Sequence, residues 1–215
     1  MSKKYKGTFI LTTLVCLLPM LAGLLLWNQL PDLMPTHWNG QGQVDDWSSK
    51  AFSVFGMPAI MLGFHGICIL AISIDPKHKN TNNKVLALVF WLCPAISLIT
   101  CSITYMTALG LDPAVEILLP LTMGFLFLLI GNYLPKCKQN HTVGIRVRWT
   151  LQDEDNWNAT HRFGGWVWVI GGIAIMATAF FGSILVFMFL TAGIALLPLF
   201  YSYFYSRKHK KGTAA

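Results

Sequence analysis

Six long apolar runs divide the chain, and they limit its possible folds more than any other feature. They cover residues 8–27, 52–74, 85–107, 115–134, 166–181 and 183–205. A helix needs ~20 apolar residues to cross the hydrocarbon core of a bilayer, and each run approaches or reaches that length. Only 12% of the residues are charged, about half of the share that is usual in soluble domains. The sequence therefore predicts a single all-α membrane domain over residues 1–215, built as a bundle of six transmembrane helices.

The placement of Lys and Arg predicts the orientation of these helices, because both residues accumulate in cytoplasmic segments of membrane proteins. If both termini are cytoplasmic, the inner segments hold every Lys and Arg except Lys50. A topology shifted by one helix would scatter these charges over both sides. We therefore expect both termini to be cytoplasmic. The net charge of +7 then indicates attraction to anionic lipids of the inner leaflet.

The expected outer loop, residues 28–51, is longer and richer in polar and aromatic residues than a helix connection requires. Its prolines disfavour helix, and its glycines allow tight turns. Three interpretations remain open: a cap held over the helix ends by its two tryptophans, a surface that recognises an external ligand, and a metal site that uses His37 and Asp45. A third metal ligand is not evident nearby, so no metal is assigned. The candidate site residues are His37, Trp38, Asn39, Gly42, Asp45 and Trp47.

The expected cytoplasmic loop, residues 135–165, contains the longest strongly polar stretch of the chain, VGIRVRWTLQDEDNWNATHRFGG. Thr150 and Asp153 have the spacing of a capping box, with Asp in place of the usual Glu. Further acidic residues follow in what would be the first turn of a helix, where negative charge is favoured. The order of these residues is typical of a helix start.

This stretch predicts a short amphipathic helix over residues 151–163, because Gly164 and Gly165 can end or bend a helix. On such a helix Asp153, Trp157 and His161 share one face. We expect it to lie along the inner membrane surface before the fifth span, with Trp157 directed inward. It serves either as an elbow that positions two spans or as a docking platform for a cytoplasmic partner.

No motif of a catalytic or cofactor site is present. HExxH, GxSxG and a nucleotide-binding glycine loop are absent. His65 is the one ionisable residue deep in an apolar run, which makes it an intramembrane candidate. It is either a neutral histidine hydrogen-bonded to a neighbouring helix or part of a proton-coupled transport path. We expect a non-enzymatic protein without a cofactor, and the alternative is a transporter or flippase that exports a toxin or a lipid.

The inner and outer motifs together resemble those of the SdpI family of bacterial membrane immunity proteins. The inner stretch is similar to the family signature, which reads approximately GIRTPWTL, an acidic segment, Trp, then Thr-His-Arg and Gly. The outer Pro-x-His-Trp-Asn-x-x-Gly-x-x-Asp segment resembles the loop found N-terminal to that signature. Val147-Arg148 replaces the Thr-Pro that is common in the family, which removes a rigid turn and adds a positive charge. The matched inner positions are Gly144, Ile145, Arg146, Trp149, Thr150, Leu151, Trp157, Thr160, His161, Arg162 and Gly164.

The resemblance implies a six-helix protein of the bacterial cytoplasmic membrane that protects the cell against a secreted antimicrobial peptide toxin. It also implies a cytoplasmic partner, a small DNA-binding repressor that is held at the membrane when toxin is bound. Direct binding of nucleic acid by this chain is not expected. On this interpretation the outer loop faces the toxin, and the residues that dock the partner are Gly144, Arg146, Trp149, Thr150, Trp157, His161 and Arg162.

Overall fold

Long helices form most of the structure, a computed structural model that describes residues 3–77 and 82–212. Lys79, which was expected in an inner turn, lies outside the described residues. The hairpin strands are β1 (Leu33–Trp38) and β2 (Val44–Ser49), and a π-helix η1 (Phe52–Gly56) and a 3-10 helix η3 (Leu134–Lys136) adjoin two of the helices. The helices are α1 (Lys3–Leu25), α2 (Met57–Ile74), α3 (Asn83–Ala108), α4 (Val115–Tyr133), α5 (Arg148–Gln152), α6 (Glu154–Thr178) and α7 (Ile184–Gly212).

Five helical segments are long and apolar enough to cross a membrane, so the prediction of a multi-pass helical membrane protein is confirmed. The expected fifth span is not among them. Its helix α6 begins with charged and polar residues, and its apolar part, residues 166–178, falls short of the ~20 residues that a bilayer requires. The five segments are Tyr5–Leu25, Phe52–Ile74, Asn83–Ala108, Val115–Lys136 and Ile184–Lys208.

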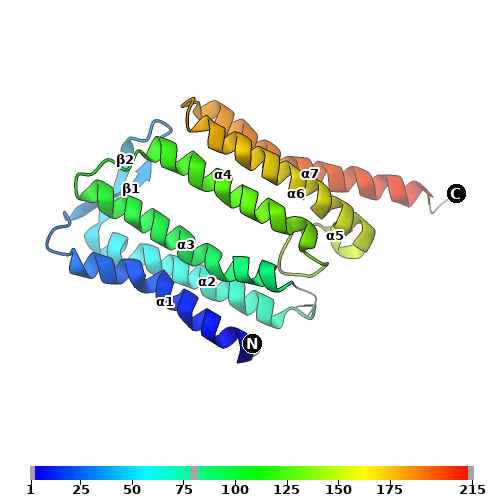
Figure 1. Cartoon of the computed structure of the whole chain (residues 1–215), viewed down its shortest axis with the longest axis horizontal. Helices are drawn as coiled ribbons and strands as arrows, with labels where there is room; N and C mark the ends of the chain where they lie inside the picture. Colours follow the sequence, from blue (N-terminus) through cyan, green and yellow to red (C-terminus); the bar gives the residue numbers. More distant parts are fainter. Residues whose placement is uncertain (1–2, 78–81, 213–215) are drawn as a thin grey trace. The chain divides into compact units, whose positions relative to one another are not determined.

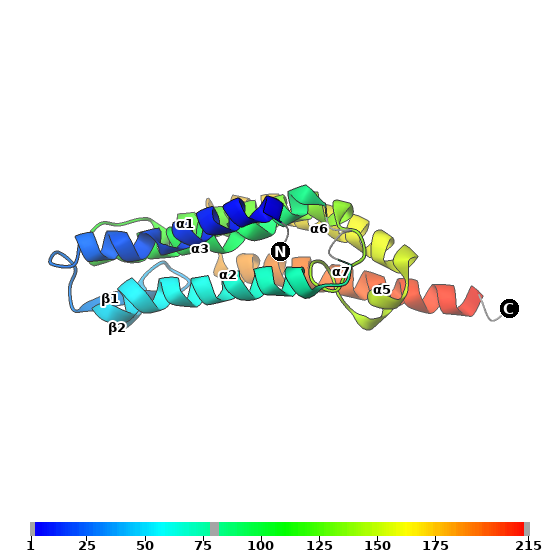
Figure 2. The ribbon, with the colours of Figure 1, turned by 90° about the horizontal axis from the view of Figure 1, so that it is seen from below.

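The chain forms two compact units, of which unit 1 comprises Met1–Ser73 and Ala87–Glu116. In unit 1 the helices α1, α2 and α3 run alongside one another, and the hairpin lies at one end (Figures 1 and 2). A Cβ atom at Gly23 would lie 2.7 Å from the Val54 side chain, so glycine allows this close approach. The buried core consists of Leu30, Met34, Val54, Cys101 and Tyr105.

Unit 2 comprises Ile74–Leu86 and Ile117–Ala215 and contains α5, α6, α7 and most of α4. A turn that includes Gly182, with φ of 60°, joins α6 to α7. The backbones of α4 and α6 approach closely, because a Cβ at Gly172 would lie 2.6 Å from the Gly124 carbonyl oxygen. A buried cluster of Val85, Cys137 and Trp157 lies beside them.

The hairpin departs from the predicted all-α fold. Its two antiparallel strands lie in the segment expected to be an outer loop, between α1 and η1. Met34 is fully buried among the core residues of unit 1. This anchor explains how a stretch rich in Asp and Ser, which disfavour strands, is held in an extended conformation.

The prediction of a separate surface helix over residues 151–163 is wrong, because the helix continues into the apolar segment. Asp153 is the N-cap of α6, and its carboxylate accepts hydrogen bonds from the N–H groups of Asp155 and Asn156. Thr150 lies in α5 instead of capping this helix. Gly165 does not end α6, because its role is close packing: a Cβ there would lie 2.7 Å from the Pro135 ring.

Candidate functional site

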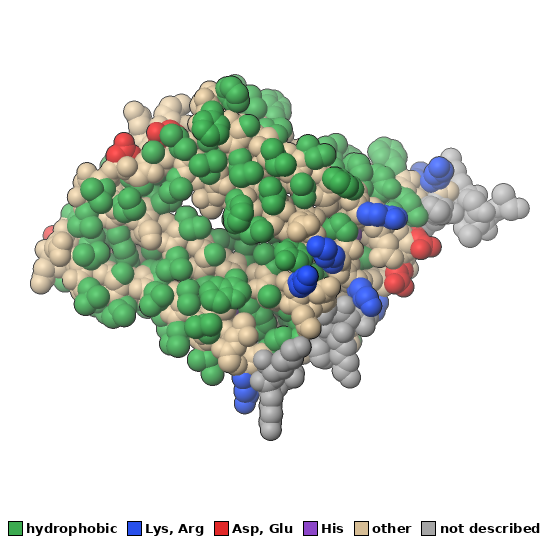
Figure 3. Space-filling model, viewed as in Figure 1, with side chains coloured by type: hydrophobic (Ala, Val, Ile, Leu, Met, Phe, Trp, Pro, Cys, Tyr) green, Lys and Arg blue, Asp and Glu red, His purple; other side chains and the backbone are tan. Residues whose placement is uncertain are grey.

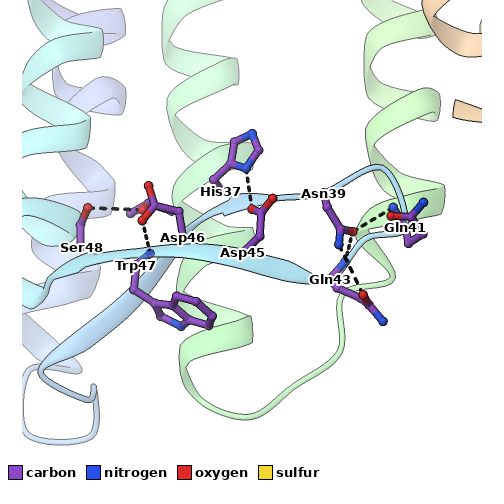
Figure 4. A network of polar contacts seen from close by, with 9 residues as sticks. His37, Asn39, Gln41, Gln43, Asp45, Asp46, Trp47 and Ser48 are labelled. Carbon is purple, nitrogen blue, oxygen red and sulfur yellow. Dashed lines mark hydrogen bonds and ion pairs between the residues drawn. The ribbon is translucent and has the colours of Figure 1, made fainter. Parts of the chain in front are cut away.

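The hairpin carries the six residues predicted for an outer recognition site. Its register pairs His37 with Asp46 and Trp38 with Val44, and it is shifted on both sides of His37. Such irregularities re-aim side chains. Here the shift brings the imidazole of His37 to the carboxylate of Asp45, with Nδ1 and Oδ1 2.5 Å apart. In Figure 4 these two side chains project from the same side of the hairpin.

Asn39 and Gly42 build the turn of the hairpin. The side-chain oxygen of Asn39 accepts hydrogen bonds from the N–H groups of Gln41 and Gln43, at 2.9 and 3.0 Å. Gly42 has a φ of 76°, a conformation that glycine adopts at little cost. A Cβ at Gly42 would also lie 3.1 Å from the backbone nitrogen of Glu116. These two residues therefore shape the turn of the hairpin.

The two tryptophans differ in their surroundings. Trp38 is half-buried, whereas Trp47 is 52% exposed, and its indole projects from the hairpin in the direction opposite to His37 (Figure 4). The interpretation of a cap held down by both tryptophans is therefore wrong for Trp47. The buried side chain of Met34 is the anchor.

Among the described residues, no group of three His, Cys, Asp or Glu side chains could hold a metal ion. His37 and Asp45 are both exposed, with 67% and 43% of their side-chain surface accessible. What this pair supplies is a charged, hydrogen-bonding surface.

The inner motif lies in unit 2 and is organised around a stacked pair, Trp157 and His161. The indole of Trp157 is fully buried, and its N–H donates to the Cys137 carbonyl at 2.7 Å. The ring of His161 lies 4.0 Å from it, centroid to centroid. Trp157 was expected to point inward. It does so by packing into the protein itself, where it contacts the loop that precedes α5.

Both nitrogens of His161 have partners that fix its tautomer. Nδ1 lies 2.8 Å from the Trp157 carbonyl, which can only accept, so Nδ1 carries the proton. Nε2 then accepts the N–H of Ile145 at 3.0 Å. Burial lowers the pKa of His161 from its ordinary value to about 4, against the opposing effect of the hydrogen bond to Trp157. The imidazole is therefore neutral at physiological pH.

Gly144 is adapted to the same pair. Its φ of 124° is a conformation that L side chains rarely adopt. A Cβ at this position would collide with Nε2 of His161 and lie 3.0 Å from the Trp157 ring. Glycine is thus required by the backbone and by its neighbours.

Thr150 and Trp149 attach the short helix α5 to its surroundings. The hydroxyl of Thr150, a fully buried side chain, accepts the Val147 N–H at 3.0 Å. The indole N–H of Trp149 donates to the Ser202 hydroxyl at 2.8 Å. Asn156, which the sequence did not single out, donates to the Ser202 carbonyl at 3.0 Å. Three of the seven predicted docking residues, Thr150, Trp157 and His161, are therefore buried and support the motif from inside.

Asp75 is a second residue of this site that the sequence did not single out. It is only 5% exposed, and its carboxylate accepts the N–H of His141 at 2.8 Å and the hydroxyl of Thr142 at 2.7 Å. The N–H of Lys77 also donates to it, at 2.8 Å. Burial alone would raise the pKa of Asp75, but these hydrogen bonds and the charge of His141 hold it below its ordinary value. We call Asp75 and residues 137–145, the loop it holds, the clasp.

Arg146 and Arg162 are the predicted docking side chains that remain exposed. The guanidinium of Arg146 donates to the His141 carbonyl. Arg162 borders an open pocket of about 450 Å³ together with Pro135, Asp155, Asn158 and Tyr205. On the face shown in Figure 3, hydrophobic side chains cover the length of the helices, and several Lys and Arg side chains gather near the end where α5 and the start of α6 lie.

His65, the intramembrane candidate, lies in unit 1 and is fully buried. Its Nε2 is 3.1 Å from the hydroxyl of Thr12 on α1, and its ring stacks on Phe9 with centroids 5.7 Å apart. Among the described residues, Nδ1 has no hydrogen-bond partner. This geometry agrees with a histidine hydrogen-bonded to a neighbouring helix.

Comparison with known proteins finds a family match over the loop of the clasp, over α5 and α6, and over most of α7. Residues 136–202 match the SdpI/YfhL protein family. The C-terminal part of the chain is thus similar to the SdpI/YfhL protein family. Residues 14–62, which include the hairpin, match a domain of unknown function, and this order agrees with the two predicted motifs.

The similarity to a curated member of the SdpI/YfhL family extends over nearly the whole chain. The immunity protein SdpI of Bacillus subtilis (strain 168) is 27% identical over 208 residues, which cover 93% of this chain and 96% of that protein. No solved structure matches the chain.

Proposed function

We propose that this chain is a non-enzymatic membrane immunity protein that protects a bacterial cell against a secreted antimicrobial peptide toxin. The observation that carries the proposal is the similarity to an immunity protein over 93% of the chain. The predicted inner motif, matched by the SdpI/YfhL family, and the predicted outer motif agree with it. Loss of the toxin's effect is the expected phenotype, without any chemical change to the toxin.

The proposed orientation follows from the distribution of charge. Both termini and the clasp face the cytoplasm, and the hairpin faces outward, because this arrangement leaves Lys50 as the basic residue on the outer side. It requires α6 to cross the membrane as a sixth span despite its short apolar part. The hairpin residues His37, Trp38, Asp45 and Trp47 then lie where a secreted peptide arrives.

The proposal is tested by expressing the chain in cells that are sensitive to a panel of secreted peptide toxins and by measuring the zones of killing. We expect a smaller zone for at least one toxin, with unchanged zones for a detergent-like control peptide. Unchanged zones for the whole panel, at protein levels verified by immunoblot, would contradict the immunity function.

A cytoplasmic role of the clasp side is proposed as a further part of this function. Arg146 and Arg162, which are exposed, and the pocket beside Arg162 provide the surface on which a small DNA-binding repressor is held while toxin is bound. Thr150, Trp157 and His161 support this surface from below, because they are buried. Recruitment of a tagged repressor to membranes only in the presence of toxin would test this part.

The second candidate function, a transporter or flippase that exports a toxin or a lipid, is favoured by one observation. His65 is fully buried in a predicted span, and its Nδ1 has no partner among the described residues. Ionisable residues inside membranes commonly mark transport pathways. This function predicts that protection is lost in His65→Ala and after addition of an uncoupler, and protection that survives both would exclude it.

A further inference from the structure

β2 has a strand partner on one side only. The sheet of the described residues contains two strands, so the outer edge of β2 carries main-chain groups that no other strand pairs. The strands also differ in burial: Met34 and Pro35 of β1 are buried, whereas Asp45, Asp46 and Trp47 of β2 are exposed. An exposed strand edge is a template for another extended chain.

Two exposed acidic side chains lie on this edge strand. Asp45 and Asp46 are consecutive on β2, and Asp32, Asp112 and Glu116 belong to the same unit. The basic residue beside the hairpin, Lys50, is largely buried, and its ammonium group lies 3.3 Å from the Asp32 carboxylate. The Asp32 carboxylate is thus paired with Lys50. Asp45 is hydrogen-bonded to His37, and Asp46 accepts the N–H of Trp47. Neither carboxylate of β2 forms an ion pair with a Lys or Arg among the described residues. The surface is complementary to positive charge.

From this geometry we infer that the edge of β2 binds a cationic peptide in extended conformation by strand addition. Main-chain hydrogen bonds supply the pairing, and Asp45 and Asp46 attract Lys or Arg side chains across the new pair. The exposed indole of Trp47 covers an apolar side chain or the stem of a cationic one. The inference rests on the proposed function in that the natural peptide would be the toxin, and it adds the charge and conformation of that peptide.

A second copy of the same strand is a poor occupant of this edge. Pairing of two β2 strands would bring four carboxylates together, and like charges on neighbouring strands are destabilising. Charged residues on strand edges prevent such self-association in other proteins. Asp45 and Asp46 therefore disfavour pairing with β2 of a second copy and favour pairing with a positively charged chain.

The test uses the full-length protein in nanodiscs of zwitterionic lipid, with empty nanodiscs as the background. The probe is a fluorescein-labelled peptide of alternating Lys and Val, and binding is measured by fluorescence anisotropy. One control peptide alternates Glu and Val. The other keeps the Lys-Val sequence but carries N-methyl groups on alternate amides, so that one of its edges cannot donate hydrogen bonds.

We expect the Lys-Val peptide to bind and the Glu-Val peptide not to bind. The double variant Asp45→Asn/Asp46→Asn should raise the Kd about tenfold, because it removes two exposed charge interactions. N-methylation should also raise it about tenfold through lost main-chain hydrogen bonds. Asp112→Asn removes the same kind of charge away from β2 and should leave the Kd within about twofold.

Equal binding of the N-methylated peptide would overturn strand addition, and equal binding of the Glu-Val peptide would overturn selection by charge. Asp46→Glu keeps the charge and should keep the affinity, so it separates loss of charge from damage to the hairpin. The killing assay is independent of these measurements. Protection without any Lys-Val binding refutes this inference alone, whereas binding without protection refutes the immunity function alone.

Discussion

The imidazole of His161 is stacked on the indole of Trp157, one helical turn away, with ring centroids 4.0 Å apart and Nδ1 hydrogen-bonded to the Trp157 carbonyl. Gly144 lies against both rings. The most recognisable residues of the inner motif thus form one packed group, and their interactions with each other explain why these residue types occur together. The first four predictions concern this group and the clasp beside it.

Replacement of Gly144 by Ala should destabilise the protein more than the same change at Gly110. Both glycines have positive φ, 124° and 79°, but a Cβ at Gly110 would meet no atom within 4 Å, whereas one at Gly144 would collide with His161. We expect Gly110→Ala to cost ~1 kcal/mol from backbone strain alone and Gly144→Ala to cost ~3 kcal/mol. Thermal unfolding of both variants in detergent measures the difference, and equal midpoints would contradict the steric role.

Acid should weaken unit 2 through His161. Above about pH 6.5, the ordinary pKa of the group, the imidazole is neutral whether the protein is folded or unfolded. Between that pH and the folded-state pKa of about 4, the unfolded chain binds a proton that the folded chain does not. Stability therefore falls as the pH falls through this window, by at most ~3 kcal/mol.

The midpoint of thermal unfolding, measured at several pH values between 4 and 8, checks this dependence. His161→Gln removes the titrating group and should flatten the slope between pH 4 and 6.5, although its stability at neutral pH is lower. An unchanged slope in His161→Gln would assign the acid sensitivity to other groups.

Asp75→Asn should loosen the clasp. The amide keeps one acceptor oxygen for the three donors that the carboxylate serves, and we expect a loss of ~2 kcal/mol. Hydrogen exchange at the amides of His141 and Lys77, which donate to Asp75, should accelerate. Asp112→Asn is the matched control, because the Asp112 carboxylate accepts the backbone N–H of Ala114 but is exposed. Equally fast exchange at the clasp in both variants would argue against the role of the Asp75 carboxylate.

The hydrogen bonds to Asp75 predict a second loss of stability in acid, at a lower pH range than that of His161. Since the pKa of Asp75 is lowered in the folded protein, its carboxylate stabilises the clasp above the ordinary Asp value, and this contribution disappears as the pH falls through the lowered folded-state value. In Asp75→Asn the exchange rates at residues 139–145, corrected for intrinsic exchange, should show less dependence on pH below 4 than in the wild type.

Arg162→Ala should abolish recruitment of the proposed cytoplasmic partner without loss of immunity. Its side chain is exposed and lines the pocket, so its removal leaves the packed residues of the motif in place. Co-purification of the partner and the zone of killing are the two measurements. Arg148→Ala removes an equal charge on α5 and should keep both partner recruitment and immunity. Loss of recruitment in both variants would indicate a general effect of positive charge.

His37→Ala, Trp38→Ala and Asp45→Ala should each reduce protection against the toxin at unchanged protein level, because their side chains form the proposed outer surface. Asn39→Ala tests a different role, since its side chain holds the turn through two backbone hydrogen bonds. It should lower the stability of the hairpin by ~1 kcal/mol as well as protection. Full protection in all four variants would place recognition elsewhere on the molecule.

The sequence was sufficient for the membrane class and for the helices whose apolar runs reach the length of a span. It did not predict the hairpin, because β2 is rich in Asp and Ser, and its conformation depends on pairing with β1 and on the burial of Met34. α6 extends beyond its predicted end because Gly164 and Gly165 pack against Ile145 and Pro135. A pair of glycines in the local sequence can indicate either the end of a helix or a close helix contact, and the sequence alone does not distinguish the two.

Two residues of the clasp region were not evident from local patterns for a related reason. Asp75 lies 66 residues before the His141 N–H that it accepts, and Asn156 lies 46 residues before the Ser202 carbonyl to which it donates. Only the folded chain brings these groups together. Conversely, the exposed charges Arg146 and Arg162 were recognised from the motif, which does not distinguish buried from accessible positions.

The position of Asp75 limits how far the family segment can be treated as a transferable part. The matched residues 136–202 include His141 and Thr142, but the carboxylate that accepts from them lies in the connection between α2 and α3. In a chimera that transplants this segment alone, the His141 N–H and the Thr142 hydroxyl would depend on the residue that the host protein has at the position of Asp75. Grafts between family members should therefore carry the α2–α3 connection together with the segment.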